Sequence, residues 1–294
     1  MKQPDVETVA HSRVRELSSD RNARVTVISN RKGGVGKTTV ALNMAGGLSR
    51  RGYRVLVIDC EPLESLTQIV LRPEDRPETS VIQYLFSEIP AEVLENPPIR
   101  REAGQSLLAH TVYPASFEPF YVVPSSEATL LAVDRTEGAT GYEFDDAISL
   151  LRPYFDHIVI DLPGQLQTHL AISALTAADG VVIPVDASVL GMNSLAGTFG
   201  LIEKIRDDQN PHMVVDGYVL SKVENKADPR VRLVRKYLNT TGGYVFRTKL
   251  RHLVAYKDSS LAGRTVFAWN DPRSTYDFTQ FLDEWEKRVQ EVAA

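Results

Sequence analysis

Cysteine and long apolar runs are almost absent from this sequence, and both absences narrow its possible functions. The only cysteine is Cys60, so the chain forms no internal disulfide and no cluster that needs several thiolates of its own. No apolar run approaches the roughly 18 residues needed to cross a bilayer. The first 23 residues mix both charge signs without an apolar segment, so we expect no secretory signal there. These features favour the reducing cytoplasm.

The charge of the chain is modest in total but unevenly distributed. The 294 residues carry a formal net charge of -5. Between Lys222 and Arg264, however, 11 Lys and Arg residues stand against 3 Asp and Glu residues, a local excess of +8. A basic segment of this kind is the electrostatic signature of a surface that binds polyanions, although the whole protein is acidic.

Short runs rich in Val and Ile alternate with helical stretches. Near-continuous apolar strands separated by helices predict an α/β fold, a mostly parallel sheet with helices on both faces. We expect a single domain over residues 24–294, preceded by an arm over residues 1–23 that is solvated or forms a short helix at 6–17. The proline-containing stretch 89–118 is expected to be a less regular surface excursion. The predicted strands are 24–29, 53–59, 120–123, 157–161, 180–185, 213–220 and a late edge strand at 243–246.

A glycine-rich loop follows the first predicted strand and precedes a helix expected at 39–50. Glycines let the backbone approach phosphates closely, and the loop N–H groups together with the helix N-terminus form an anion nest. In this setting Lys37 is expected to reach the β- and γ-phosphates of ATP, and the Thr38 hydroxyl to bind Mg²⁺. The sequence therefore predicts a P-loop NTPase whose nucleotide-binding residues are Gly33, Gly34, Val35, Gly36, Lys37, Thr38 and Thr39.

The string Lys-Gly-Gly-Val-Gly-Lys-Thr-Thr at residues 32–39 resembles the hallmark of the ParA/MinD superfamily of deviant Walker A ATPases. In that family the first lysine crosses a two-fold interface and touches the nucleotide of the partner subunit. The resemblance implies that Lys32 does the same here, which would make ATP the link of a sandwich homodimer. It extends over nearly the whole chain from Arg24 onward.

Three acidic residues match the carboxylates of that family. Asp59 matches the first residue of an Asp-x-Asp motif near the metal, and Asp161 matches the Walker B aspartate. Glu61 replaces the aspartate that positions the attacking water, and its extra methylene moves the carboxylate by about 1.5 Å. The resemblance implies slow, partner-stimulated ATP hydrolysis. It assigns catalytic roles to Lys32, Lys37, Asp59 and Glu61, and metal contacts to Thr38, Asp59 and Asp161.

The basic segment resembles the C-terminal part of plasmid and chromosome partition ATPases, which bind DNA without sequence preference through phosphate contacts. A helix is expected to start at Asp228-Pro229 and to bury Val231, Val234 and Leu238. The resemblance also implies an adaptor protein of the ParB type and association with the nucleoid. The candidate DNA contacts are Arg230, Arg232, Arg235, Lys236, Arg247, Lys249, Arg251 and Lys257.

Other members of the superfamily are alternatives. A MinD-like regulator binds membrane through a basic amphipathic C-terminal helix, whereas the polar side of the last predicted helix here is acidic, so we expect no membrane contact and a helix that packs on its own core. An iron protein of the nitrogenase type needs cysteine ligands at the interface, but Cys60 falls between Asp59 and Glu61, where a packing role is expected. A small-molecule ATP-dependent ligase remains the alternative from another class.

Overall fold

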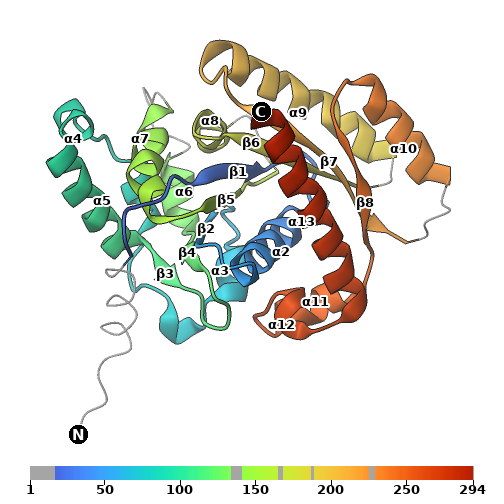
Figure 1. Ribbon diagram of the computed structural model, residues 1–294, viewed down its shortest axis with the longest axis horizontal. Helices are drawn as coiled ribbons and strands as arrows, with labels where there is room; N and C mark the ends of the chain where they lie inside the picture. Colours follow the sequence, from blue (N-terminus) through green and yellow to red (C-terminus); the bar gives the residue numbers. More distant parts are fainter. Residues whose placement is uncertain (1–16, 134–140, 165–167, 187–188, 225–228, 294) are drawn as a thin grey trace, which may run out of the picture.

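The computed structural model describes residues 17–133, 141–164, 168–186, 189–224 and 229–293, and its centre is one eight-stranded sheet (Figure 1). The strand order is β3-β4-β2-β5-β1-β6-β7-β8. The β3–β4 pair is antiparallel, and all other neighbours pair in parallel. This arrangement confirms the predicted α/β class. The helix expected at 6–17 lies almost wholly outside the described residues.

Every predicted strand is present, with shifts of a few residues at the ends. The late edge strand β8 continues to Arg251. Strand β3 was not predicted, because two residues are too few for a periodic pattern. The strands are β1 (Arg24–Ile28), β2 (Val55–Asp59), β3 (Tyr113–Pro114), β4 (Tyr121–Val123), β5 (His157–Asp161), β6 (Gly180–Asp186), β7 (Val214–Val223) and β8 (Val245–Arg251).

The helices form a layer on each face of the sheet (Figure 1). One layer contains α2 (Lys37–Arg50), α3 (Ser65–Val70), α11 (Val254–Leu261), α12 (Val266–Trp269) and α13 (Pro272–Ala293). The other contains α5 (Pro97–Thr111), α6 (Glu127–Val133), α7 (Tyr142–Leu151), α8 (His169–Thr176), α9 (Val189–Asp208) and α10 (Pro229–Thr240), with α4 (Ala91–Glu95) beside α5. Short 3-10 turns occupy Pro73–Asp75, Ile82–Phe86 and Arg152–Tyr154.

Alternating side chains of the strands feed two separate cores. In β2, Val55 and Val57 point to the core beneath α2 and α13, whereas Leu56 and Ile58 point to the core beneath α7 and α8. All four are fully buried. A sheet that is buried on both faces explains why its strands appear as continuous apolar runs in the sequence.

The expectation of an irregular excursion at 89–118 is wrong for most of that stretch. Helix α5 has 15 residues and packs against α7. Asn96 caps it through a hydrogen bond from the Ile99 N–H, and the two prolines that follow occupy its first positions. Proline is favoured at the start of a helix because its missing N–H has no intrahelical partner there. The prolines thus mark a helix start that we interpreted as irregularity.

The C-terminal helix α13 packs its apolar stripe on the protein itself, as predicted. Phe278, Phe281, Leu282 and Trp285 are all buried beneath the sheet. The Glu284 carboxylate accepts hydrogen bonds from two backbone N–H groups of the edge strand β8. In the described part of the chain, no helix is long and apolar enough to span a membrane.

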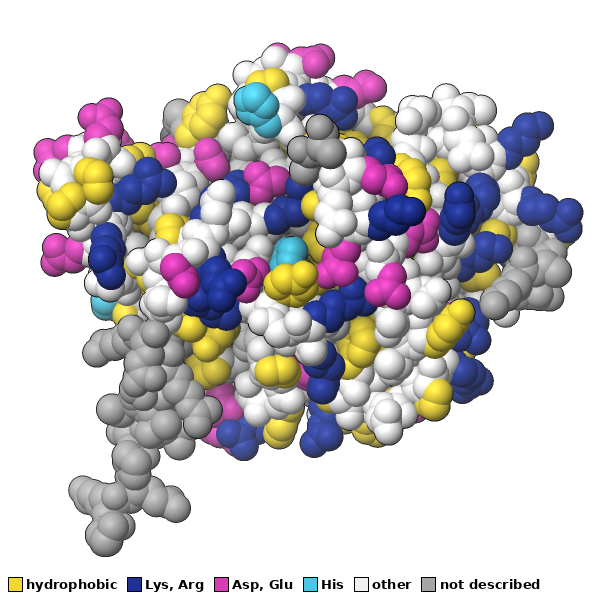
Figure 2. Space-filling model, in the orientation of Figure 1, with side chains coloured by type: hydrophobic (Ala, Val, Ile, Leu, Met, Phe, Trp, Pro, Cys, Tyr) yellow, Lys and Arg dark blue, Asp and Glu magenta, His cyan; other side chains and the backbone are white. Residues whose placement is uncertain are grey.

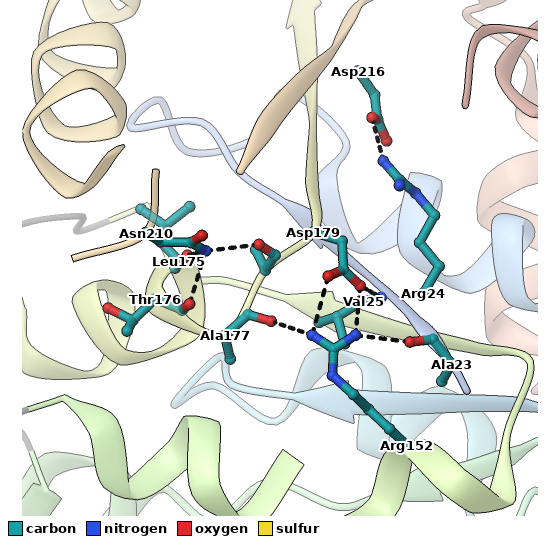
Figure 3. A network of polar contacts seen from close by, with 11 residues as sticks. Ala23, Arg24, Val25, Arg152, Leu175, Thr176, Ala177, Asp179, Asn210 and Asp216 are labelled. Atoms are coloured by element: carbon teal, nitrogen blue, oxygen red, sulfur yellow. Dashed lines mark hydrogen bonds and ion pairs between the residues drawn. The ribbon is translucent and has the colours of Figure 1, made fainter. Parts of the chain in front are cut away.

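At the amino ends of the strands, charged groups are paired with one another (Figure 3). Asp179 accepts hydrogen bonds from the Arg152 guanidinium and from the Val25 N–H. Asp216, which is fully buried, accepts a hydrogen bond from Arg24 at 2.7 Å and another from the Trp285 indole at 2.9 Å. These pairs fix the starts of β1, β6 and β7 at the edge of the sheet opposite the glycine-rich loop.

Candidate nucleotide site

The glycine-rich loop connects β1 to α2 at the carboxyl edge of the sheet, as the sequence predicts. Gly36 caps α2 with a φ of 93°, a conformation that residues with a Cβ rarely adopt. The end of β7 supports the loop from below, because the Ser221 hydroxyl donates a 2.7 Å hydrogen bond to the carbonyl of Val35. The loop N–H groups and the N-terminus of a 14-residue helix are thereby available to an anion.

Lys37 begins α2 and is buried, with only 7% of its surface exposed. Burial lowers the pKa of its ammonium, and the negative charges of Asp161 and Glu61 partly offset that effect. The Nζ atom lies 3.5 Å from the backbone carbonyl of Lys32, across the mouth of the loop. A buried ammonium that spans the loop is suited to hold phosphate oxygens rather than to pair with solvent.

Asp59, at the end of β2, is fully buried and held by three donors. Its carboxylate accepts hydrogen bonds from the Thr67 N–H and hydroxyl and from the Glu61 N–H. Burial nevertheless raises the pKa of Asp59 to about 6. Thr67 is a positioning residue that sequence reasoning missed, because its link to Asp59 depends on how the loop after β2 folds back.

Asp161, at the end of β5, is fully buried and, unlike Asp59, receives no backbone N–H hydrogen bond in good geometry from the described residues; the Thr38 side chain is the donor that acts on its carboxyl group. Within the described part of the chain, neither carboxylate oxygen has a hydrogen-bond partner in good geometry. Burial and the nearby Asp59 raise the pKa of Asp161 well above its usual range, and the neighbouring Thr38 and Lys37 side chains only partly compensate. A buried polar atom without a partner costs free energy, so it indicates a group that the protein binds at this place.

The residues present fit a magnesium ion shared with a nucleotide. No group of three or more His, Cys, Asp or Glu residues in the described ranges could hold a metal by itself. Hard oxygen ligands are available, however, from the Thr38 hydroxyl and from the carboxylates of Asp59 and Asp161. Mg²⁺ is typically bound by one or two such protein groups together with waters and substrate phosphates. The carboxylate oxygens of Asp161 would accept hydrogen bonds from water on a metal ion bound here.

Glu61 and the loop after β5 complete the edge of the site. The Glu61 backbone carbonyl accepts a 2.8 Å hydrogen bond from the Ser125 hydroxyl, which ties its loop to the segment after β4. Its charge acts on the pKa values of both Lys37 and Asp161, so the three groups share one site. A Cβ on Gly164 would lie 3.1 Å from the backbone carbonyl oxygen of Arg31, so this glycine lets the loop after β5 approach the phosphate loop closely.

A cavity of about 250 Å³ opens beside the phosphate loop. Gly36 and Thr39 form one wall, the end of β7 forms another, and the segment from Leu250 to Ser260 forms the third. A nucleotide whose phosphates lie in the loop has room here for its nucleoside. Two of the candidate DNA contacts, Arg251 and Lys257, line this cavity.

The candidate DNA contacts differ in their solvent exposure, and two of the arginines have identified partners within the protein. Arg251 forms a bidentate ion pair with Asp277, both bonds being 2.8 Å, and Arg235 donates to the carbonyls of Val245 and Phe246. These two arginines therefore have structural partners. The solvent-exposed side chains are Arg230, Arg232, Lys236, Arg247 and Lys257, whereas Lys249 is partly buried. Asp228 lies outside the described residues, but Val231, Val234 and Leu238 of α10 are buried as predicted.

Lys32 leads into the loop from β1, and its ammonium lies near the end of β6. Its Nζ atom is 2.5 Å from the Asp186 carboxylate. The Lys32 N–H donates to the Asn30 side chain, which in turn donates to the carbonyl of Pro184. Cys60, fully buried, packs in the core as expected. Asn30 and Asp186 are further residues that the sequence analysis did not single out.

Comparisons with known proteins agree with this geometry. A family profile described as AAA domain matches residues 23–215. The chromosome partitioning protein ParA of Caulobacter vibrioides is 26% identical over 84% of this chain and 87% of its own length. The chromosome-partitioning ATPase Soj of Thermus thermophilus is 27% identical over 92% of this chain and 98% of its own length.

The chain belongs to the ParA/MinD superfamily of deviant Walker A ATPases. It is accordingly an ATPase with a P-loop fold, and ATP and Mg²⁺ fit the loop and the carboxylates described above. When bound, Mg²⁺ neutralises negative charge on the phosphate oxygens. Lys37 and the loop N–H groups are the candidates for holding the phosphates, and Thr38, Asp59 and Asp161 are the residues that would hold the metal ion.

Solved structures share the fold at low identity. Apo McdA from Cyanothece superposes with a TM-score of 0.74, at 20% identity over 91% of this chain and 99% of that chain. The cell division ATPase MinD of Pyrococcus furiosus gives 0.68, at 20% identity over 90% and 99%. Cobyrinic acid a,c-diamide synthase of Mycobacterium smegmatis, with bound ADP and magnesium, gives 0.65, at 21% identity over 86% and 97%.

Proposed function

We propose that this ATPase is of the partition type: ATP joins two subunits across Lys32, the dimer binds DNA without sequence preference, and hydrolysis releases it. The observation that carries the proposal is the presence of two separate charged regions on one domain. One is the phosphate loop with its additional lysine. The other is a set of exposed cations on α10 and β8, and Figure 2 shows Lys and Arg side chains gathered along that margin, on the right of the view.

Phosphate contacts from such a surface are independent of base sequence and weaken steeply with salt, because each contact releases a condensed counterion. The exposed cations Arg230, Arg232, Lys236 and Arg247 are the proposed contacts, with Lys249 at their border. Arg251 and Lys257 belong to the wall of the nucleoside cavity in this proposal, and Arg235 joins α10 to β8. We propose the nucleoid as the location and an adaptor of the ParB type as the partner that stimulates hydrolysis.

In the proposed hydrolysis step, Glu61 orients the attacking water at the γ-phosphate. Lys37 and the loop N–H groups bind the phosphate oxygens and stabilise the charge that develops on them. Glu61 lies near enough to Lys37 and Asp161 for its charge to act on both, and this supports its assignment to the attacking water. The Glu61→Gln variant should retain ATP binding and lose most of the turnover, measured as phosphate release. Turnover at the wild-type rate would refute the role.

The test of the whole proposal is binding to a random-sequence DNA duplex with ATP, with ADP and without nucleotide, across a salt series. We expect binding only with ATP, little dependence on base sequence, and a steep loss of affinity as salt rises. The Lys32→Ala variant is the matched control, because it should keep nucleotide binding but lose both dimer and DNA. Absence of DNA binding in every nucleotide state would refute the proposal.

A small-molecule ATP-dependent ligase is the second candidate, since the Mycobacterium smegmatis synthase has the same fold. The membrane alternative is disfavoured, because the apolar stripe of α13 that would enter a bilayer is packed on the sheet. Two results together would favour the ligase. The rate of ATP hydrolysis would be independent of DNA and of dimerisation, and a carboxylic acid together with an amide donor would increase it.

A further inference from the structure

The ammonium of Lys32 has a partner within its own subunit. Its Nζ atom lies 2.5 Å from Oδ2 of Asp186, the last residue of β6. The side chains of the two residues are 23% and 21% exposed, so the pair is only partly shielded from water. This charge-assisted contact holds the ammonium within its own subunit.

The backbone of Lys32 is fixed by other contacts. Its N–H donates to Asn30 Oδ1 at 2.9 Å, and Asn30 Nδ2 donates to the Pro184 carbonyl at 2.7 Å. The preceding Arg31 N–H donates to the Thr198 hydroxyl on α9 at 3.2 Å. The start of the loop is therefore joined to β6 and α9 without Asp186. The Asp186 carboxylate contacts the Lys32 ammonium, and Asn30 and Thr198 accept hydrogen bonds from the backbone N–H groups of Lys32 and Arg31.

We propose that Asp186 is a positioning residue that holds Lys32 in its own subunit and competes with the nucleotide of a second subunit for the same ammonium. This inference rests on the proposed function, in which Lys32 acts across the dimer. The ammonium is a compact charge on a flexible stem, so it can exchange a carboxylate for phosphate oxygens by rotation of side-chain bonds alone. Dimerisation then includes the breaking of the Lys32–Asp186 pair.

Two-fold symmetry doubles the effect of this competition. Both subunits of an isologous dimer give up the same pair, so the dimer dissociation constant contains the per-subunit factor twice. A partly exposed ion pair changes such an equilibrium by about threefold. Loss of the pair should therefore tighten the ATP-bound dimer by about tenfold.

The experiment measures the dimer dissociation constant by analytical ultracentrifugation, with Mg²⁺ and a non-hydrolysable ATP analogue. We expect Asp186→Asn to lower the constant about tenfold and Asp186→Glu, which restores the charge, to return it toward the wild-type value. The matched control is Asp208→Asn at the exposed end of α9, the helix that follows β6, and it should change nothing. Binding of a fluorescent nucleotide to the dilute monomer should stay within about twofold of wild type in all three variants.

Two results separate this inference from the proposed function. If Lys32→Ala is monomeric but Asp186→Asn dimerises like wild type, or less well, the competition is refuted and the role of Lys32 stands. If Lys32→Ala dimerises like wild type, the role of Lys32 across the interface fails, and the inference fails with it. The Lys32→Ala/Asp186→Asn double variant should gain nothing over Lys32→Ala, since the pair no longer exists to be broken.

Discussion

Buried carboxyl groups lie at both edges of the sheet, but they differ in their hydrogen-bond partners. At the amino edge, Asp216 is fully buried and has two donors, Arg24 and Trp285 (Figure 3). At the carboxyl edge, Asp161 is equally buried and has no donor in good geometry among the described residues. Burial raises the pKa of both carboxyl groups. Burial alone therefore does not distinguish a structural carboxylate from a functional one, whereas the presence of partners does.

The difference follows from what each edge must do. A paired charge at the amino edge orders the strands and needs nothing further. An unpaired carboxylate lowers the stability of the empty protein, and this cost is retained only where a ligand removes it. Bound nucleotide and Mg²⁺ should stabilise the chain through the carboxyl edge alone.

Removing a paired carboxylate should have the largest effect on stability. Asp216→Ala leaves the Arg24 guanidinium and the Trp285 N–H without their acceptor. We expect the free energy of unfolding to fall by about 3–5 kcal/mol, with nucleotide affinity unchanged in the folded fraction. Urea titration measures the first quantity and fluorescent nucleotide titration the second. Asp161→Asn is the matched variant: it should not destabilise the empty protein, yet it should weaken Mg²⁺-dependent binding. Equal destabilisation by both variants would contradict the comparison.

At the carboxyl edge, the lysine of the loop should carry the largest single effect on binding. Lys37→Ala removes the ammonium that spans the loop mouth, while the loop itself is still held by Ser221. We expect ATP affinity to fall by roughly 100-fold, about 3 kcal/mol, with little change in the free energy of unfolding of the empty protein. Isothermal titration calorimetry measures the affinity. Unchanged ATP affinity would refute the assignment of the phosphate loop.

Opposite pH dependences are expected for two groups whose pKa burial shifts, His157 at the amino edge and Asp161 at the carboxyl edge. His157, at the start of β5, has its pKa lowered to about 4 by burial, against an ordinary value of 6.5. Because the unfolded chain binds this proton more tightly than the folded chain, stability is fully present above pH 6.5 and is lost as pH falls toward 4. Asp161 has a raised pKa, so the folded chain holds its proton more tightly, and its effect on stability falls as pH rises.

The contribution of each residue to the pH dependence of stability can be isolated by comparing a variant with wild type. Relative to His157→Phe, wild type should lose about 3 kcal/mol of unfolding free energy between pH 6.5 and pH 4. Relative to Asp161→Asn, wild type should lose unfolding free energy as pH rises above the ordinary carboxyl pKa of 3.8. Urea titrations at several pH values measure both differences. If stability relative to the variant changed with pH in the same direction for both residues, the opposite signs expected for His157 and Asp161 would be refuted.

The sequence allowed prediction of what depends on local pattern. The strands follow from apolar runs, and the phosphate loop from glycines and Lys37 in register after β1. The partner of Arg251 could not be predicted, because Asp277 lies 26 residues away on another element. The same is true of Lys32, since its contact with Asp186 spans 154 residues. Such pairs depend on how the chain folds. A count of charged residues in the sequence does not distinguish an arginine in an ion pair from one that is exposed to solvent.

The smallest effect tests this distinction between engaged and exposed cations. Arg232 and Lys236 are exposed on one face of α10, four residues apart. The Arg232→Ala/Lys236→Ala variant should weaken DNA binding by about fivefold, roughly 1 kcal/mol, and lower the slope of log affinity against log salt by about 2. Arg251→Ala should instead lower stability and nucleotide affinity, because Arg251 pairs with Asp277 and lines the cavity beside the loop. DNA titrations over a salt series, with ATP saturating for each variant, measure the slopes. An Arg251→Ala variant that reduced the salt slope and left nucleotide affinity intact would move the DNA surface to the mouth of the nucleotide site, and the division between the two kinds of cation would fail.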